Sequence, residues 1–127
     1  MAAQPQDAYF ETSGDDGAAV VRQALRRDVN ERVGIDRHSD RGKEETVDVL
    51  CECVDRSCAG RIAMSVNDYE AVRRFPTRFF IKEGHELSEG DRIVAALGGY
   101  VVIEKSGREG LYAVRSDPRR RRLHAVG

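Results

Sequence analysis

Residues 46–60, TVDVLCECVDRSCAG, contain all three cysteines of the chain, and the predicted fold is built outward from this segment. Over residues 46–53 apolar and polar positions alternate, which predicts a strand. Side chains two apart on a strand project to the same face, so Cys51 and Cys53 are expected on one side. The polar residues 55–57 predict a turn, from which Cys58 returns toward the other two thiols.

This clustering favours a metal ion over a disulfide framework. The number of cysteines is odd, and thiols of cytoplasmic proteins stay reduced. Thiolates that lie close together suit Zn²⁺, with an iron–sulfur centre as the alternative metal group. Three protein ligands leave tetrahedral zinc one ligand short, and we predict His85 as the fourth, because it follows Gly84 at the end of a predicted strand. Glu52 and Asp55 are weaker oxygen alternatives.

Other interpretations of the same residues stay open. The three thiols are also compatible with small buried core residues or with a redox sensor. Arg56 and Arg61 are expected to lower the pKa of the Cys58 thiol and Glu52 and Asp55 to raise it, so the sequence does not predict its reactivity. Cys58 as nucleophile with His85 as base has suitable residue types, but the sequence suggests no third orienting group.

Downstream of the cysteines, local signals predict a short helix and a hairpin. Ser65 followed by Asp68 resembles a capping box and predicts a helix over 66–74 that Pro76 ends. Two apolar runs, 92–97 and 100–104, flank Gly98-Gly99, which predicts a hairpin with positive φ at both glycines. A helix over 89–97 is the competing prediction. Residues 111–115 are expected to add an edge strand.

Upstream of the cysteines, an apolar residue at every fourth position predicts an amphipathic helix. The expected core face is formed by Val21, Leu25, Val29 and Val33, with Ala18 and Ala24 alongside. The expected solvated face is formed by Arg22, Arg26, Arg27, Glu31 and Arg32. A helix that contacts nucleic acid through this basic face is the alternative.

The chain has 127 residues, which predicts one small α+β domain: an N-terminal amphipathic helix and a small, mostly antiparallel sheet with a zinc-knuckle-like cysteine cluster. The expected organisation is a disordered acidic N-terminus 1–16, an N-terminal helix 17–37, a linker 38–44, a metal-binding α+β domain 45–116 and a disordered basic tail 117–127. Charged residues make up 34% of the chain, so its core is thin and a metal would help to stabilise it.

The basic C-terminal tail is a candidate segment for contact with nucleic acid. Its run of four arginines, Arg119, Arg120, Arg121 and Arg122, would neutralise phosphates, although exposed basic tails more often only keep a protein soluble. The formal net charge of −1 combines an acidic N-terminus with a basic tail, and residues 18–114 carry 16 basic and 17 acidic groups, which predicts no basic face for the domain. Neither a secretory signal nor an apolar run long enough to span a membrane is apparent, so we expect a cytoplasmic protein without membrane contact.

The cysteine cluster and several flanking motifs resemble a group of short actinobacterial proteins without an assigned function. The similar positions fall within residues 28–105 and comprise Asn30-Glu-Arg32, Cys51-Glu-Cys53, Cys58, Ile62, Tyr69, Val72-Arg73, Pro76, Phe79, Gly84-His85-Glu86 and Tyr100–Lys105. The resemblance implies a shared small domain with Cys51, Cys53, Cys58 and His85 as its notable positions, and it implies no enzyme, substrate or partner.

These observations lead to one expected function and one alternative. The sequence carries no G-x-G-x-x-G, Walker or G-x-S-x-G motif beside the cysteine cluster. We therefore expect a non-enzymatic zinc-binding regulatory or adaptor module that acts through protein or nucleic-acid contacts. The alternative is a thiol or iron–sulfur redox sensor. The sequence does not predict the oligomeric state.

Overall fold

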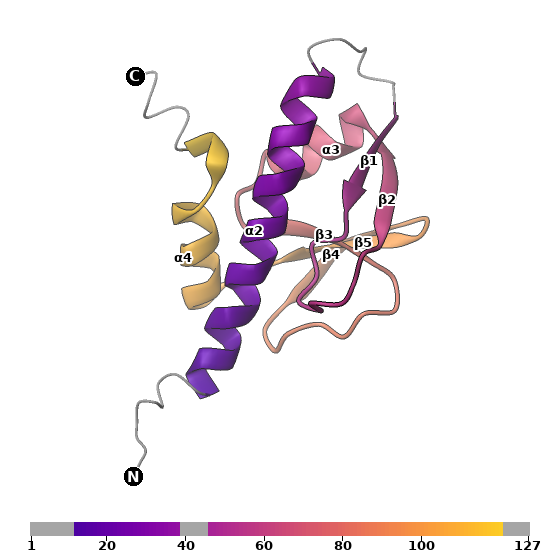
Figure 1. Ribbon diagram of the computed structural model, residues 1–127. Coiled ribbons are helices and arrows are strands. Elements are labelled where there is room, and N and C mark those ends of the chain that lie inside the picture. The colour runs from indigo at the N-terminus through magenta and orange to yellow at the C-terminus, as the bar shows by residue number, and fades with distance from the viewer. Residues whose placement is uncertain (1–11, 39–45, 121–127) are drawn as a thin grey trace.

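The computed structural model describes residues 12–38 and 46–120, with the side chains of the first helix described over 18–32 (Figure 1). Its elements are α2 (Thr12–His38), β1 (Thr46–Leu50), β2 (Arg61–Ser65), α3 (Val66–Arg73), β3 (Arg78–Lys82), β4 (Arg92–Leu97), β5 (Tyr100–Glu104) and α4 (Gly107–Arg115). The α+β class is confirmed, as an N-terminal helix with two small antiparallel sheets. The predictions for residues 1–11, for the linker after His38 and for Arg121 and Arg122 lie outside the described residues.

Strands β1 and β2 form an antiparallel pair whose register runs from Thr46 opposite Ser65 to Leu50 opposite Arg61. The predicted strand over 46–53 therefore ends earlier, at Leu50. The reason is a change of partner, because the amide of Glu52 donates to the carbonyl oxygen of Phe80 on β3 at 3.0 Å. The chain thus passes from the first sheet to the edge of the second.

The second sheet has the strand order β3-β5-β4, with antiparallel neighbours. The hairpin of β4 and β5 is confirmed at its predicted bounds, and a helix over 89–97 is excluded. Of the two turn glycines only Gly99 has a positive φ, 92°, so the prediction of positive φ at both was wrong. Positive φ at the second central residue alone is the pattern of a type II turn, whereas positive φ at both is the pattern of type I′.

The short helix α3 begins where its capping signal places it. The amide of Asp68 donates to Ser65 Oγ at 3.0 Å, as expected for a Ser at the position before the helix. The helix ends at Arg73, within one residue of the predicted end and before Pro76. Its buried side chains, among them Tyr69, join Phe79, Phe80 and Ile103 in the core.

The segment predicted as an edge strand, 111–115, is instead part of helix α4. This helix packs beside α2 (Figure 1). The small residues Gly110 and Ala113 are buried, and a Cβ atom on Gly110 would lie only 3.0 Å from the carbonyl oxygen of Lys105. Arg27 of α2 donates from Nη2 to the carbonyl oxygen of Ala113 at 2.9 Å. The contact with Arg27 comes from a distant part of the chain, and such packing outweighs the weak local preference for a strand.

Helix α2 is present but turned relative to the prediction. Leu25 and Val29, expected in the core, are 58% and 44% exposed. The side chains that face inward are Ala19, Val20, Gln23, Ala24, Arg27, Asn30 and Glu31. Of these only Ala24 was assigned to the core face, whereas Arg27 and Glu31 were assigned to solvent. The polar side chains can be buried because each finds hydrogen-bond partners, as described below.

Three boundaries also differ from the prediction. Helix α2 begins at Thr12, inside the expected disordered N-terminus, and includes His38 of the expected linker. The expected disordered tail 117–127 is ordered up to residue 120, because Asp117 and Pro118 are buried and Arg119 binds two carboxylates. Among the described helices, none combines the length and the apolar character needed to cross a membrane.

Candidate metal centre

The cysteines lie on the loop 51–60 between β1 and β2, which we call the knuckle. The amide of Cys51 donates to the carbonyl oxygen of Gly60 at 3.0 Å and closes the base of the knuckle. At its tip the carboxylate of Asp55 accepts hydrogen bonds from the amide and the hydroxyl of Ser57, at 3.0 and 2.8 Å. The amide of Cys58 donates to the carbonyl oxygen of Asp55 at 3.1 Å, which turns the chain back. The predicted turn over 55–57 thereby brings Cys58 beside Cys51 and Cys53.

The fourth predicted ligand arrives from the other sheet. His85 follows β3 and a glycine with φ of 98°, Gly84, and its Nε2 lies 3.4 Å from Cys58 Sγ. The three sulfur atoms and one imidazole nitrogen all lie within 4.8 Å of one another. Around tetrahedral zinc with bonds of about 2.0–2.3 Å, ligand atoms are about 3.3–3.8 Å apart. The cluster could hold a metal ion after shifts of about 1 Å or less.

Each of the three sulfur atoms also receives an N–H group. The amide of Lys82 donates to Cys51 Sγ at 3.2 Å, and the amide of Gly60 donates to Cys58 Sγ at 3.4 Å. Arg26 Nη1 lies 3.9 Å from Cys53 Sγ. Hydrogen bonds from N–H groups favour the thiolate over the thiol. These N–H groups therefore act against burial and favour the ionised sulfurs that a metal requires.

Comparisons with known proteins assign the chain to no family. No family model, curated protein or solved structure matches the chain. The resemblance to short actinobacterial proteins stays a prediction, and the assignment of the site depends on its own chemistry.

Without a metal the three thiols differ in acidity. Burial raises the pKa of Cys51 to about 12 and also raises the pKa of Cys53. Burial acts on Cys58 in the same direction, but the Gly60 amide, the neighbouring thiols and the Arg26 charge hold its pKa below the usual value. A metal must displace the protons of the thiols it binds, above all those of Cys51 and Cys53 whose pKa is raised, so its affinity rises with pH.

The other groups considered as ligands lie elsewhere. Glu52 points away from the thiols into the core, where Arg73 binds both of its carboxylate oxygens. The Asp55 carboxylate is occupied by Ser57. The side chain of His38 and the whole of His124 lie outside what the structure describes. All four residues predicted as ligands are brought together, and neither oxygen alternative joins them.

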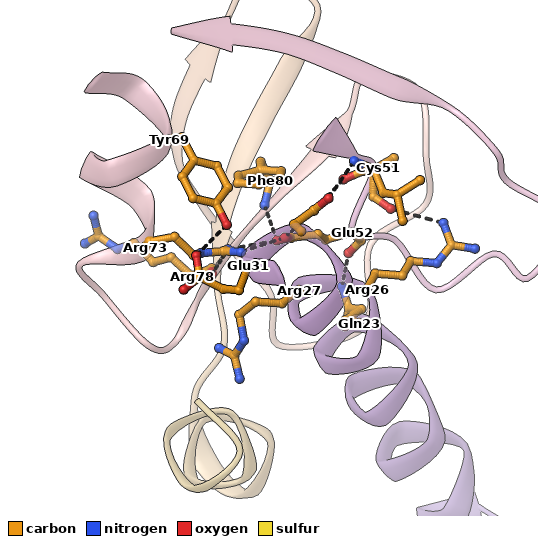
Figure 2. A network of polar contacts seen from close by, with 12 residues as sticks. Gln23, Arg26, Arg27, Glu31, Cys51, Glu52, Tyr69, Arg73, Arg78 and Phe80 are labelled. Carbon is orange, nitrogen blue, oxygen red and sulfur yellow. Dashed lines mark hydrogen bonds and ion pairs between the residues drawn. The ribbon is translucent and has the colours of Figure 1, made fainter. Parts of the chain in front are cut away.

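Sequence reasoning missed the buried polar network under the knuckle (Figure 2). Arg73 Nη1 and Nη2 lie 2.7 and 2.9 Å from the two carboxylate oxygens of Glu52, and the two side chains are 2% and 0% exposed. Asn30 donates from Nδ2 to Glu52 Oε2 at 2.9 Å, and the amide of Phe80 donates to Glu52 Oε1 at 3.3 Å. Glu52, the residue between two of the candidate ligands, is thus fixed by α2, α3 and β3 at once.

The same network contains the inner face of α2. Its polar residues Gln23, Arg26, Arg27, Asn30 and Glu31 are spaced three or four apart, as one face of a helix requires. This spacing was the available signal, but it is also the pattern of a solvated face. Only the hydrogen-bond partners, which lie 20 or more residues away in the sequence, distinguish a buried polar face from a solvated one.

Proposed function

We propose that Cys51, Cys53, Cys58 and His85 bind one Zn²⁺ ion and that the chain works as a non-enzymatic regulatory or adaptor module built around it. The observation that carries the proposal is the convergence of four soft ligand atoms within 4.8 Å. Three thiolates and one imidazole form a ligand set typical of structural zinc. All four positions would be filled by the protein, whereas catalytic zinc sites keep one position open for water or substrate.

The 3.4 Å separation of Cys58 Sγ and His85 Nε2 also suits a nucleophile and its base. That interpretation uses two of the four residues and leaves Cys51 and Cys53 beside them without a role. Zinc accounts for all four residues and for the N–H groups on each sulfur. We therefore favour a metal centre over a catalytic pair.

An adaptor role needs a contact surface, and the outward face of α2 supports one for a protein partner. Leu25 and Val29 are exposed there at a spacing of four residues. The arginine tail supports nucleic-acid contact less, because Arg119 is bound by Glu31 and Glu70 at 2.8 and 2.9 Å. A nucleic-acid role for Arg120, Arg121 and Arg122 stays a prediction that salt-dependent binding would test.

The test is the metal content of protein purified without added metal, together with its optical spectrum. We expect one zinc per chain and no visible colour, and the cobalt-substituted protein should show thiolate-to-cobalt charge transfer. Cys53→Ser should lower the metal affinity by a factor of ten or more. Glu86→Gln, an exposed neighbour of His85, is the matched control and should bind as the unaltered chain does. Protein that holds no metal even after incubation with zinc would overturn the proposal.

A redox sensor is the second candidate, and the exposure of Cys58 favours it. Cys58 is half-buried whereas Cys51 and Cys53 are buried, and its thiol has the lowered pKa of the three. A low pKa and access to solvent are the properties of an oxidisable thiol. Visible absorption from bound iron, or a Cys58 disulfide formed by mild peroxide in metal-free protein, would favour this candidate. A colourless zinc protein whose thiols resist the same treatment would exclude it.

A further inference from the structure

Three polar side chains of helix α2 bind backbone carbonyl oxygens of the knuckle, and two of them, Gln23 and Arg26, are labelled in Figure 2. Arg22 Nε donates to Val54 at 3.0 Å, and Gln23 Nε2 donates to Glu52 at 3.1 Å. Arg26 donates to three carbonyl oxygens, those of Cys51, Asp55 and Cys58, at 3.0–3.1 Å. These hydrogen bonds can form together only when the knuckle is folded, because only the closed loop brings the carbonyl groups close to one another.

Of these three side chains, Arg26 is the one that contacts the cysteines most directly. Its guanidinium binds the carbonyl oxygens of Cys51 and Cys58, and its Nη1 lies 3.9 Å from Cys53 Sγ. One side chain of α2 therefore contacts every cysteine of the cluster. Zinc with three thiolates and a neutral imidazole carries a net charge of −1, which the adjacent guanidinium would balance.

We propose that Arg26 is a positioning residue for the metal centre and that metal binding and the docking of α2 on the knuckle are thermodynamically linked. The inference rests on the proposed zinc site and adds its regulation. If docked α2 raises the metal affinity by a given factor, bound metal strengthens the docking of α2 by the same factor. Partners that hold metal ligands from outside typically contribute about 10- to 100-fold in affinity. Metal occupancy would thus control how firmly the helix that displays Leu25 and Val29 is held.

One experiment measures the metal side of this linkage. Zinc affinity is determined by competition with a chromophoric chelator for the unaltered chain, for Arg26→Gln and for Arg32→Gln. Arg32 lies exposed on the same helix and serves as the matched control. We expect Arg26→Gln to bind zinc about 10- to 100-fold more weakly and Arg32→Gln to bind as before. In the cobalt-substituted protein, Arg26→Gln should also shift the thiolate-to-cobalt charge-transfer band, which a general loss of stability would not do.

A second experiment measures the helix side and needs no variant. Amide hydrogen exchange is followed in the unaltered chain with zinc and after chelation. An isolated helix is marginal in water, so the protection of α2 amides depends on docking. We expect residues 20–30 to lose more protection on zinc removal than the hairpin β4–β5, whose strands pair with each other and with β3.

The outcomes separate the linkage from the metal site. A chain that binds zinc but shows equal affinity for Arg26→Gln and Arg32→Gln, with α2 protection indifferent to zinc, overturns the linkage and leaves the metal site standing. A chain that binds no metal overturns both. Weaker binding by Arg26→Gln together with zinc-dependent protection of α2 supports the linkage.

Discussion

At the scale of single residues, Glu31 shows how this chain uses buried charge. Its carboxylate accepts a hydrogen bond from the Tyr69 hydroxyl at 2.6 Å, and Arg119 binds both of its oxygens at 2.8 and 3.1 Å. Burial alone would raise the pKa of Glu31, but the hydrogen bonds from Arg119 and Tyr69 outweigh it and hold the pKa at about 2. The folded chain therefore keeps Glu31 ionised where an unfolded chain would bind a proton.

This shift predicts an acid-sensitive contribution to stability. A carboxyl whose pKa is lowered by folding contributes its full stabilisation at pH values above its unfolded-state pKa of 4.5. The contribution is lost as the pH falls toward the folded-state pKa of about 2. At pH 7, Glu31→Gln should lower the free energy of unfolding by about 2 kcal/mol, since charged hydrogen bonds are lost. Urea unfolding at pH 7, 5 and 3 should show this difference shrinking with acid. A difference that stays constant across the series would contradict the assignment, and Glu86→Gln is the exposed control.

At the scale of secondary structure, the rotation of α2 can be tested by two substitutions on its opposite faces. Asn30 is buried, donates to the Leu50 carbonyl oxygen and accepts from the Leu50 amide at 3.1 and 2.8 Å, so Asn30→Ala should cost about 2–3 kcal/mol. Leu25 is exposed, so Leu25→Gln should change the free energy of unfolding by less than about 0.5 kcal/mol. Chemical denaturation of the two variants gives both values. Were the apolar stripe in the core, the order of the two effects would be reversed.

The elements also show which features the sequence could predict. Signals that act within a few residues were sufficient for local structure: the Ser65 cap and the Gly98-Gly99 turn placed α3 and the hairpin, and the Asp55 turn brought Cys58 beside the other thiols. The orientation of α2 and the helical form of α4 depend on carbonyl groups and carboxylates that lie far away in the sequence. Hydrophobic periodicity assigns the apolar side of a helix to the core. It fails where buried polar side chains each find at least one hydrogen-bond partner among such distant groups.

At the scale of the whole molecule, the residues of the candidate metal centre come from two small sheets, of which the two-stranded one is too small to be stable alone. One sheet has two strands and the other has three, and isolated two-stranded pairs are marginal in water. The cysteines come from the connection of β1 and β2, whereas His85 follows β3. Direct links between these parts include the bond from the Lys82 amide to Cys51 Sγ and the bond from the Glu52 amide to Phe80. A metal would add three cysteine bonds and one histidine bond at this junction.

Removal of the metal should therefore destabilise the whole chain and not the knuckle alone. A ligand present at 1,000 times its dissociation constant stabilises the folded state by about 4 kcal/mol, which for a chain of this size corresponds to a fall in Tm on the order of 15 °C when it is removed. Thermal unfolding followed by circular dichroism, with and without a strong chelator, measures the fall. Cys53→Ser should unfold at the lower temperature in both conditions, because its site is already impaired. If the unaltered zinc-loaded chain keeps the same Tm after verified loss of its metal, then hydrogen bonds and burial alone join the two sheets, and the metal serves another purpose than stability.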